Sequence, residues 1–240
     1  MVILFSILTF VSTFLGGLFG LKHKDQLHLI LGFTAGVLLG VVAFDIFPEI
    51  IKLLGQTHVE PVFPMVALVA GFLIFHILEK ALLIHHSQEG AYGQHKHPTV
   101  GMLSALALAG HSFLDGVGIG LAFQVSPSVG TLIAIAVIAH DFSDGLNTVS
   151  LVLTHKNPHH RAIYFLFLDA LAPVVGAFAT KFFTLSEQSL LLYLGFFAGF
   201  LLYIGASDIL PEAHSQQSSY KTILLTILGV GFIFLITRFT

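Results

Sequence analysis

Two short motifs place a histidine and an aspartate four residues apart. HSFLDG begins at His111 and HDFSDG begins at His140, so the acids are Asp115 and Asp144. Residues i and i+4 share one face of a helix, so two antiparallel helices could bring two imidazoles and two carboxylates together. Four such ligands suit tetrahedral Zn²⁺, and they also suit Mn²⁺, Fe²⁺, Co²⁺ or Ni²⁺. The spacing therefore predicts a central divalent-metal site whose two aspartates balance the charge of the ion.

The same motifs predict a second subsite. Ser112 and Asp141 occupy corresponding positions, each directly after a histidine. Oxygen atoms from these two side chains would form a weaker cation site beside the central one. A single buried histidine is more often structural, so the metal interpretation depends on finding the pattern twice.

Further acids predict a vestibule on each side of the central site. Asp45 and Glu49 form the outer group, and Asp208, Glu212 and His214 form the inner one. The acids fall in apolar segments, where an ionised carboxylate is costly, and no lysine or arginine lies deep enough in these segments to pair with them. A bound cation would neutralise them. The alternatives are neutral carboxyls that only join helices, and solvated acids at helix ends.

The elements that must position these residues are membrane helices. Of the 240 residues, 55% are hydrophobic and 10% are charged, with a mean hydropathy of +0.92 and no cysteine. Soluble domains carry roughly a quarter charged residues, and a membrane span needs about 20 mostly apolar ones. We therefore expect an all-α polytopic membrane protein with a single transmembrane domain over residues 1–240. Its eight helices are expected at residues 1–21, 27–53, 61–84, 99–123, 128–155, 162–184, 189–213 and 220–238.

Two internal repeats relate these helices. GFTAGVLLGVVAFDIFPE begins at Gly32 and GFFAGFLLYIGASDILPE begins at Gly195, an offset of 163, and the two histidine motifs form the second repeat. The repeats fall in helices 2 and 7 and in helices 4 and 5, so the two members of each pair run in opposite directions. Such inverted repeats are typical of secondary transporters with a midplane site. Pro48 and Pro211 are expected to break the last turn of their helices and to free backbone carbonyls.

The linker expected at about residues 85–98 contains four histidines, His85, His86, His95 and His97. We expect these side chains to accept or sense metal. Basic residues concentrate in cytoplasmic loops, and an outer N-terminus places seven lysines and arginines inside against three outside. We therefore predict that both termini are extracytoplasmic and that the histidine-containing linker faces the cytoplasm.

Together these features resemble the ZIP (Zrt/Irt-like) family of metal transporters over essentially the whole chain. The segments AGVLLGVVAFDIFPE and AGFLLYIGASDILPEAH are similar to the family's second and seventh helices, and the paired histidine–acid–glycine motifs to its fourth and fifth. The resemblance implies a metal site made by the two motifs, with a neighbouring site at Ser112 and Asp141. It also implies transport of Zn²⁺, Fe²⁺, Mn²⁺ or Cd²⁺ toward the cytoplasm by two bundles that slide past each other.

The chain departs from the family pattern at three places. Asp115 and Asp144 stand where the family usually has glutamate, and the prolines that usually precede those acids are missing. Because aspartate is one methylene shorter, the helices must approach more closely or hold a different ion. In the family's sixth helix a glutamate usually precedes a proline, whereas Ala172 precedes Pro173 here, with Asp169 one turn earlier.

These observations predict a secondary transporter that moves a divalent transition-metal cation, with Zn²⁺ favoured, across the cell (inner) membrane. The metal is its substrate, and no cofactor is expected. The expected partners are the lipid bilayer and metal ions, without nucleic acid, and a homodimer is left open. The alternative is a membrane-embedded zinc hydrolase acting on a lipid or peptide, in which the metal activates water. The sequence lacks H-E-x-x-H and a separate general base, and two-sided symmetry favours transport.

Overall fold

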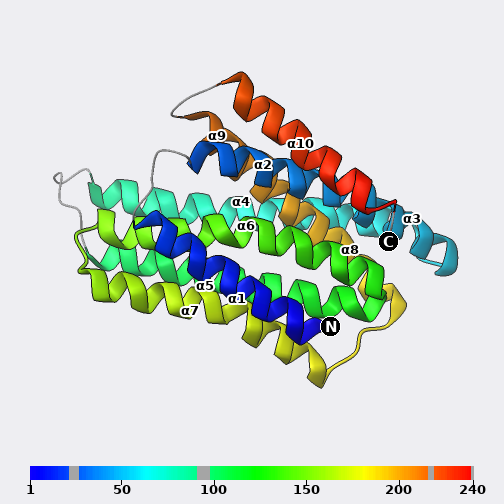
Figure 1. Ribbon diagram of the computed structural model, residues 1–240. Helices are drawn as coiled ribbons and strands as arrows, with labels where there is room; N and C mark the ends of the chain where they lie inside the picture. The colour runs from blue at the N-terminus through cyan, green and yellow to red at the C-terminus, as the bar shows by residue number, and fades with distance from the viewer. Residues whose placement is uncertain (22–26, 91–97, 216–218, 239–240) are drawn as a thin grey trace.

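The computed structural model describes residues 1–21, 27–90, 98–215 and 219–238 (Figure 1). Within these residues all regular structure is helical and forms eight rods, which confirms the predicted all-α polytopic fold. The rods are α1 (Val2–Gly20); α2 (Leu27–Val41) with the π-helical η1 (Val42–Ile46) and α3 (Phe47–Gln56); α4 (Val62–Gly90); α5 (Pro98–Val125); α6 (Pro127–Thr154); α7 (His159–Ala179) with the 3₁₀ turn η2 (Thr180–Phe182); α8 (Glu187–Leu202) with the π-helical η3 (Tyr203–Ile209) and α9 (Leu210–Ser215); and α10 (Tyr220–Ile236).

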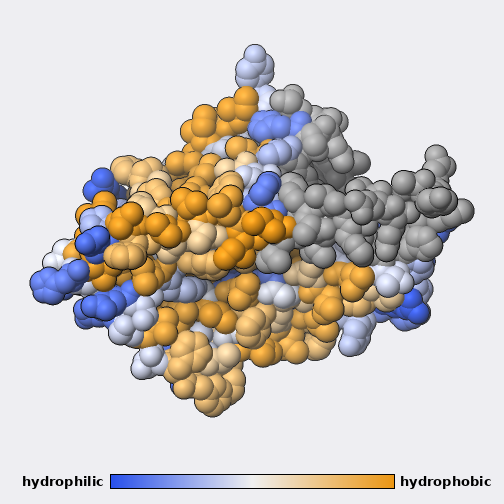
Figure 2. All heavy atoms as spheres, turned by 180° about the vertical axis from the view of Figure 1, so that it is seen from behind, coloured by the Kyte–Doolittle hydropathy of each residue, from blue (hydrophilic) through white to orange (hydrophobic). Residues whose placement is uncertain are grey.

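The helices are built for a bilayer. Six helical stretches in the described part of the chain are long and apolar enough to span one, and Val62–Ile77 and Tyr220–Ile236 are shorter apolar helices. Helix α1 buries polar side chains and exposes apolar ones. Ser6 and Thr9 are buried, whereas Ile3 and Ile7 are exposed. Small polar residues inside such a bundle allow close helix packing while apolar side chains face lipid. Figure 2 shows hydrophobic side chains over the middle of the surface and hydrophilic ones gathered toward its two ends.

Serine residues define where several helices begin. The side chain of Ser126 accepts a hydrogen bond from the backbone N–H of Val129 at 3.2 Å, and Pro127 opens α6. Ser186 caps α8 in the same way. A serine N-cap satisfies an amide that the helix leaves unpaired, and proline is tolerated in the first turn, where its missing N–H costs nothing. The Ser126 cap is the single residue between α5 and α6, which therefore form an antiparallel hairpin.

The helices form two groups. In one group α5 packs against α7 and α6, and α6 packs against α1. In the other, α2 packs against α10 and α8 packs against α4, and the segments η1, η3 and α9 join α2 to α8. Both chain termini lie at the same end of the bundle (Figure 1), as an even number of crossings requires. Which side of the membrane they face stays a prediction.

Glycine contacts within the first group repeat between its two halves. On one side, a Cβ at Gly116 of α5 would collide with the carbonyl of Pro173 in α7. A Cβ at Gly176 of α7 would likewise collide with the carbonyl of Phe113. Glycine therefore permits backbone-to-backbone contact between α5 and α7.

The corresponding contacts join α6 to α1. A Cβ at Gly145 would collide with the carbonyl of Thr13, and one at Gly16 would collide with the carbonyl of Phe142. In the two motifs, Gly145 of α6 corresponds to Gly116 of α5, and Phe142 corresponds to Phe113. The two motif helices thus pack on α1 and α7 in the same manner, as expected for an inverted repeat.

The longer repeat extends to an irregularity of the backbone. Neither proline ends its helix, contrary to the expected break: Pro48 continues into α3 and Pro211 into α9. Instead, the N–H of Phe47 bonds to the carbonyl of Val42, five residues back, and Leu210 bonds in the same way to Gly205. A proline in an ordinary α-helix clashes with the carbonyl four residues earlier, and in both repeats the residue four earlier, Phe44 or Ser207, belongs to the π segment.

Helix α4 is longer than the sequence pattern suggested. It runs to Gly90 rather than ending near residue 84, because residues such as Gln88 and Glu89 tolerate a helix and glycine is the first strong breaker. His85 and His86 therefore lie on the backbone of α4, although their side chains fall outside the described residues. His95 and His97 lie entirely outside them.

Candidate metal site

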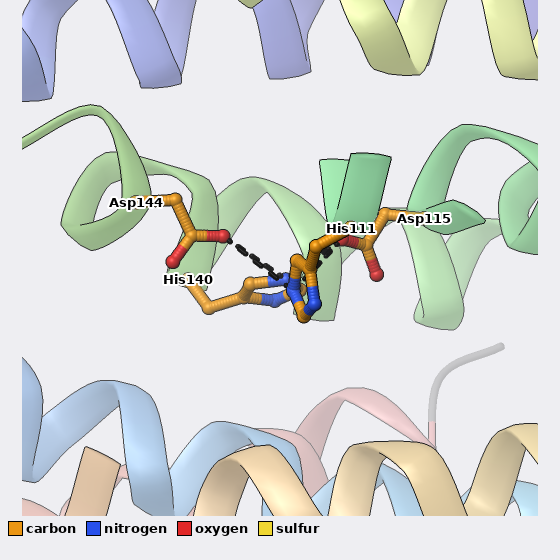
Figure 3. Close-up of side chains that lie close together, drawn as sticks. All are labelled: His111, Asp115, His140 and Asp144. Carbon is orange, nitrogen blue, oxygen red and sulfur yellow. Dashed lines mark hydrogen bonds and ion pairs between the residues drawn. The ribbon is translucent and has the colours of Figure 1, made fainter. Parts of the chain in front are cut away.

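The four residues of the predicted central site, His111, Asp115, His140 and Asp144, lie together between α5 and α6 (Figure 3). One ligand atom from each lies within 4.8 Å of all the others. Each helix contributes one imidazole and one carboxylate, because both pairs are spaced by four residues and project from one face of their helix.

Asp115 lies at the centre of this arrangement. Its Oδ2 atom is 3.2 Å from Nε2 of His111 and 3.3 Å from Nε2 of His140. Oδ2 of Asp144 lies 3.7 Å and 3.8 Å from the same two nitrogens. In a tetrahedral Zn²⁺ site with bonds of about 2.0–2.1 Å, neighbouring ligand atoms are about 3.3 Å apart. These histidine–carboxylate separations are thus close to those of a tetrahedral cage.

A backbone carbonyl on the side away from the site fixes the orientation of the His140 ring. Its Nδ1 atom lies 3.0 Å from the backbone carbonyl of Ala136. A carbonyl only accepts hydrogen bonds, so Nδ1 carries a proton, and the lone pair of Nε2 would be the donor to an ion in the site. Metal-binding histidines are commonly held in this way by a carbonyl on the other ring nitrogen.

Aromatic rings hold His111 from the other helix group. Its imidazole packs against Phe200 of α8, with ring centroids 4.9 Å apart, and edge-on against Phe75 of α4 at 6.2 Å. The site is therefore closed toward α4 and α8 by apolar rings. Such surroundings strengthen electrostatic contacts between a cation and its carboxylates.

The two residues of the predicted second subsite have different partners. Ser112 Oγ lies 2.7 Å from Oδ1 of Asp169 and 3.1 Å from the carbonyl of Leu108, and no contact with Asp141 is among those described. Asp141 is fully buried, with one oxygen 3.8 Å from Nε2 of His140 and neither oxygen in a hydrogen bond within the described part of the chain.

Asp169, to which the sequence pattern assigned no role, forms a polar junction between helices. It is fully buried in α7 and accepts hydrogen bonds from Ser112 of α5 at 2.7 Å and from Thr148 of α6 at 2.8 Å. The carboxylate thereby joins three helices directly behind the central site. Thr148 lies one turn after Asp144, and this spacing was the available signal that it faces the same region.

The outer vestibule residues have unlike surroundings. Asp45 lies in η1, is 8% exposed, and has an oxygen without a hydrogen-bond partner in the described residues. Glu49 pairs with Lys52, whose Nζ lies 3.1 Å from both carboxylate oxygens. The expectation that these acids lack basic partners is therefore wrong for Glu49, because Lys52 lies three residues later on the same helix face.

The inner vestibule group is described at His214. His214 lies half-buried in α9. The side chains of Asp208 and Glu212 fall outside the described residues, so their predicted role as an inner vestibule stays a prediction.

The fold and the site define a class: a polytopic helical membrane protein with a histidine–aspartate cluster between two antiparallel spans. Comparison with known proteins makes this more specific. The family model described as ZIP Zinc transporter matches residues 84–237, which is more than half of the chain, and the protein belongs to this family.

A curated relative points the same way. The chain is 40% identical over 147 residues to "Protein zntA" of Dictyostelium discoideum. The match covers 56% of this chain and 28% of that protein, so the chain spans less than a third of the length of this relative.

Proposed function

We propose that this protein is a secondary carrier that moves a divalent transition-metal cation across the cell membrane toward the cytoplasm, with Zn²⁺ as the favoured substrate. The observation that carries the proposal is the central site. Two imidazoles and two carboxylates converge between spans that repeat each other in opposite directions. Two carboxylates neutralise a doubly charged ion, which makes its presence in a low-dielectric interior tolerable.

The donor set also bears on the choice of ion. Neutral imidazole and carboxylate suit Zn²⁺ and its neighbours Fe²⁺, Mn²⁺ and Cd²⁺, and the absence of cysteine removes the thiolates that favour Cu⁺. Direction toward the cytoplasm rests on the family resemblance alone. The extracytoplasmic placement of the termini rests on the distribution of basic residues.

In this mechanism the ion passes from Asp45 and Glu49 to the central site. It then leaves past the inner vestibule, and the histidines of the linker accept or sense it. Ser112 and Asp141 provide the neighbouring subsite, where the two unpaired oxygens of Asp141 are the available donors. Four protein donors within 4.8 Å leave little room for the open coordination position that a zinc hydrolase requires.

The test is uptake by purified protein in proteoliposomes across a panel of divalent metals, comparing the native chain with His140→Ala. We expect saturable uptake with Zn²⁺ among the best substrates, and a loss of at least about tenfold in the variant, because an oriented ligand is removed. Undiminished uptake by His140→Ala would remove the central site from the mechanism. Metal-dependent hydrolysis of a lipid amide or peptide without ion flux would decide for the hydrolase.

A further inference from the structure

An aromatic stripe on α8 lies along the metal-bearing face of α5. Tyr193, Phe197 and Phe200 follow each other at spacings of four and three residues, so they share one helix face. The rings of Tyr193 and Phe197 stack at 5.6 Å, and Phe197 contacts Phe200 at 5.5 Å. Phe200 in turn covers His111 of the central site. The stripe thus leads from the site toward the C-terminal end of α5, with Tyr193 at its far end.

The hydroxyl of Tyr193 is buried and has no hydrogen-bond partner within the described residues. It lies against Gly118 of α5, where an added Cβ would be 3.1 Å from the hydroxyl oxygen and 2.6 Å from the ring of Phe197. The missing side chain at Gly118 therefore leaves the space that this hydroxyl occupies. A buried hydroxyl without a partner is unfavourable, and phenylalanine at this position would avoid the cost.

A second unpaired atom lies one turn away on the same face of α5. Asp115 precedes Gly118 by three residues, and its Oδ1 atom is buried without a hydrogen-bond partner in the described chain. The other oxygen of Asp115 is the one that contacts both histidines. The Tyr193 hydroxyl thus lies beside α5 about one turn from a carboxylate oxygen that the two histidines leave unused.

We propose that the Tyr193 hydroxyl is an oxygen ligand of the divalent cation. The hydroxyl and Oδ1 of Asp115 bind the ion before it reaches the two histidines. This inference rests on the proposed transport function. The end of α5 that Tyr193 faces is the one predicted to lie on the outer side, from which the ion arrives. A hydroxyl is an acceptable ligand for Zn²⁺ or Mn²⁺ but carries no charge, so it can release the ion to the carboxylates and imidazoles beyond it.

The test compares Tyr193→Phe with the native chain by measuring initial Zn²⁺ uptake into proteoliposomes over a range of concentrations. Tyr164→Phe is the matched control, because Tyr164 lies on α7 with 62% of its surface exposed. We expect Tyr193→Phe to raise the apparent KM about three- to tenfold, as loss of one hydrogen-bond-strength contact would, with Vmax within about twofold. The Tm should hold or rise, because an unpaired buried hydroxyl is removed. The control should match the native chain.

A second variant approaches the same contact from α5. Gly118→Ala fills the space beside the hydroxyl, and we expect it to raise the apparent KM as well. An unchanged KM in Tyr193→Phe, or a lower Vmax at native KM, overturns the inference while transport itself stands. A fall in Tm with native uptake kinetics assigns Tyr193 a packing role and also overturns it. Absence of Zn²⁺ uptake by the native chain refutes the transport function and this inference with it.

Discussion

The two histidine motifs are nearly alike in sequence, but the protein holds them differently. His140 of α6 is fully buried, and a backbone carbonyl fixes its ring. The side chain of His111 in α5 keeps 16% exposure and packs on the ring of Phe200. The acids differ as well, since Asp115 approaches both histidines to 3.2–3.3 Å and Asp144 stays at 3.7–3.8 Å. A repeat thus supplies equal chemistry, and the surroundings make its two copies unequal.

The backbone packing of the two motifs is alike at their glycines. The glycine that ends each motif packs against a backbone carbonyl in both halves, at Pro173 for Gly116 and at Thr13 for Gly145. The two helices therefore share this glycine contact, and they differ where the ligand side chains meet their neighbours. Three measurements test whether the two motifs are unequal in function as well as in surroundings.

The largest effect should come from the acids. Asp115→Asn keeps the size of the side chain but removes the charge that contacts both histidines, so we expect Zn²⁺ uptake to fall about 100-fold or more, in proportion to roughly 3 kcal/mol of lost ion stabilisation. Uptake by Asp144→Asn should fall less, by about tenfold, because the Asp144 oxygen lies farther from the Nε2 atoms of both histidines. Initial uptake rates in proteoliposomes measure both. Equal losses would mean that the two copies act as equals once the ion is bound.

The shared glycine packing predicts a loss of stability that is similar for the two motifs and of intermediate size. Gly116→Ala and Gly145→Ala each force a methyl group against a backbone carbonyl, so we expect each to destabilise the protein by about 1–3 kcal/mol and to lower Tm by several degrees. Gly110→Ala is the control, because a Cβ there meets nothing within 4 Å. Thermal unfolding in detergent gives the readout. A loss confined to one motif would contradict the symmetric packing.

The smallest effect should come from the support of His111. Phe200→Leu removes an aromatic contact worth about 0.5–1.5 kcal/mol, and we expect Zn²⁺ uptake to decline about twofold to tenfold. Phe63→Leu on α4 serves as the control, because Phe63 is 54% exposed. Uptake kinetics and Tm should be compared for both variants. Native kinetics in Phe200→Leu would show that the ion alone orients His111.

Local spacing explains what the sequence could reveal. Four-residue pairs place ligands on one helix face, so the four central residues and the eight helices followed from pattern and hydropathy. The polar junction did not, because Asp169 is 57 residues from Ser112 and 21 from Thr148. Such contacts depend on which helices are neighbours. The ring contact between Phe200 and His111 depends on the same information, and the partner of Glu49 was missed although Lys52 lies only three residues away.

The π turns have a consequence for how the acids are aimed. Successive residues of an α-helix are about 100° apart, so one residue accommodated in a wider turn rotates everything beyond it by about that angle. Asp45 lies inside η1 and Glu49 lies beyond it, so their angular phase departs from that of an ordinary four-residue pair. The second π segment ends at Ile209, at the same repeat position as Ile46 in the first. Both repeats therefore carry a phase shift of this kind, and losing one residue from either segment would change the direction in which the residues beyond it point.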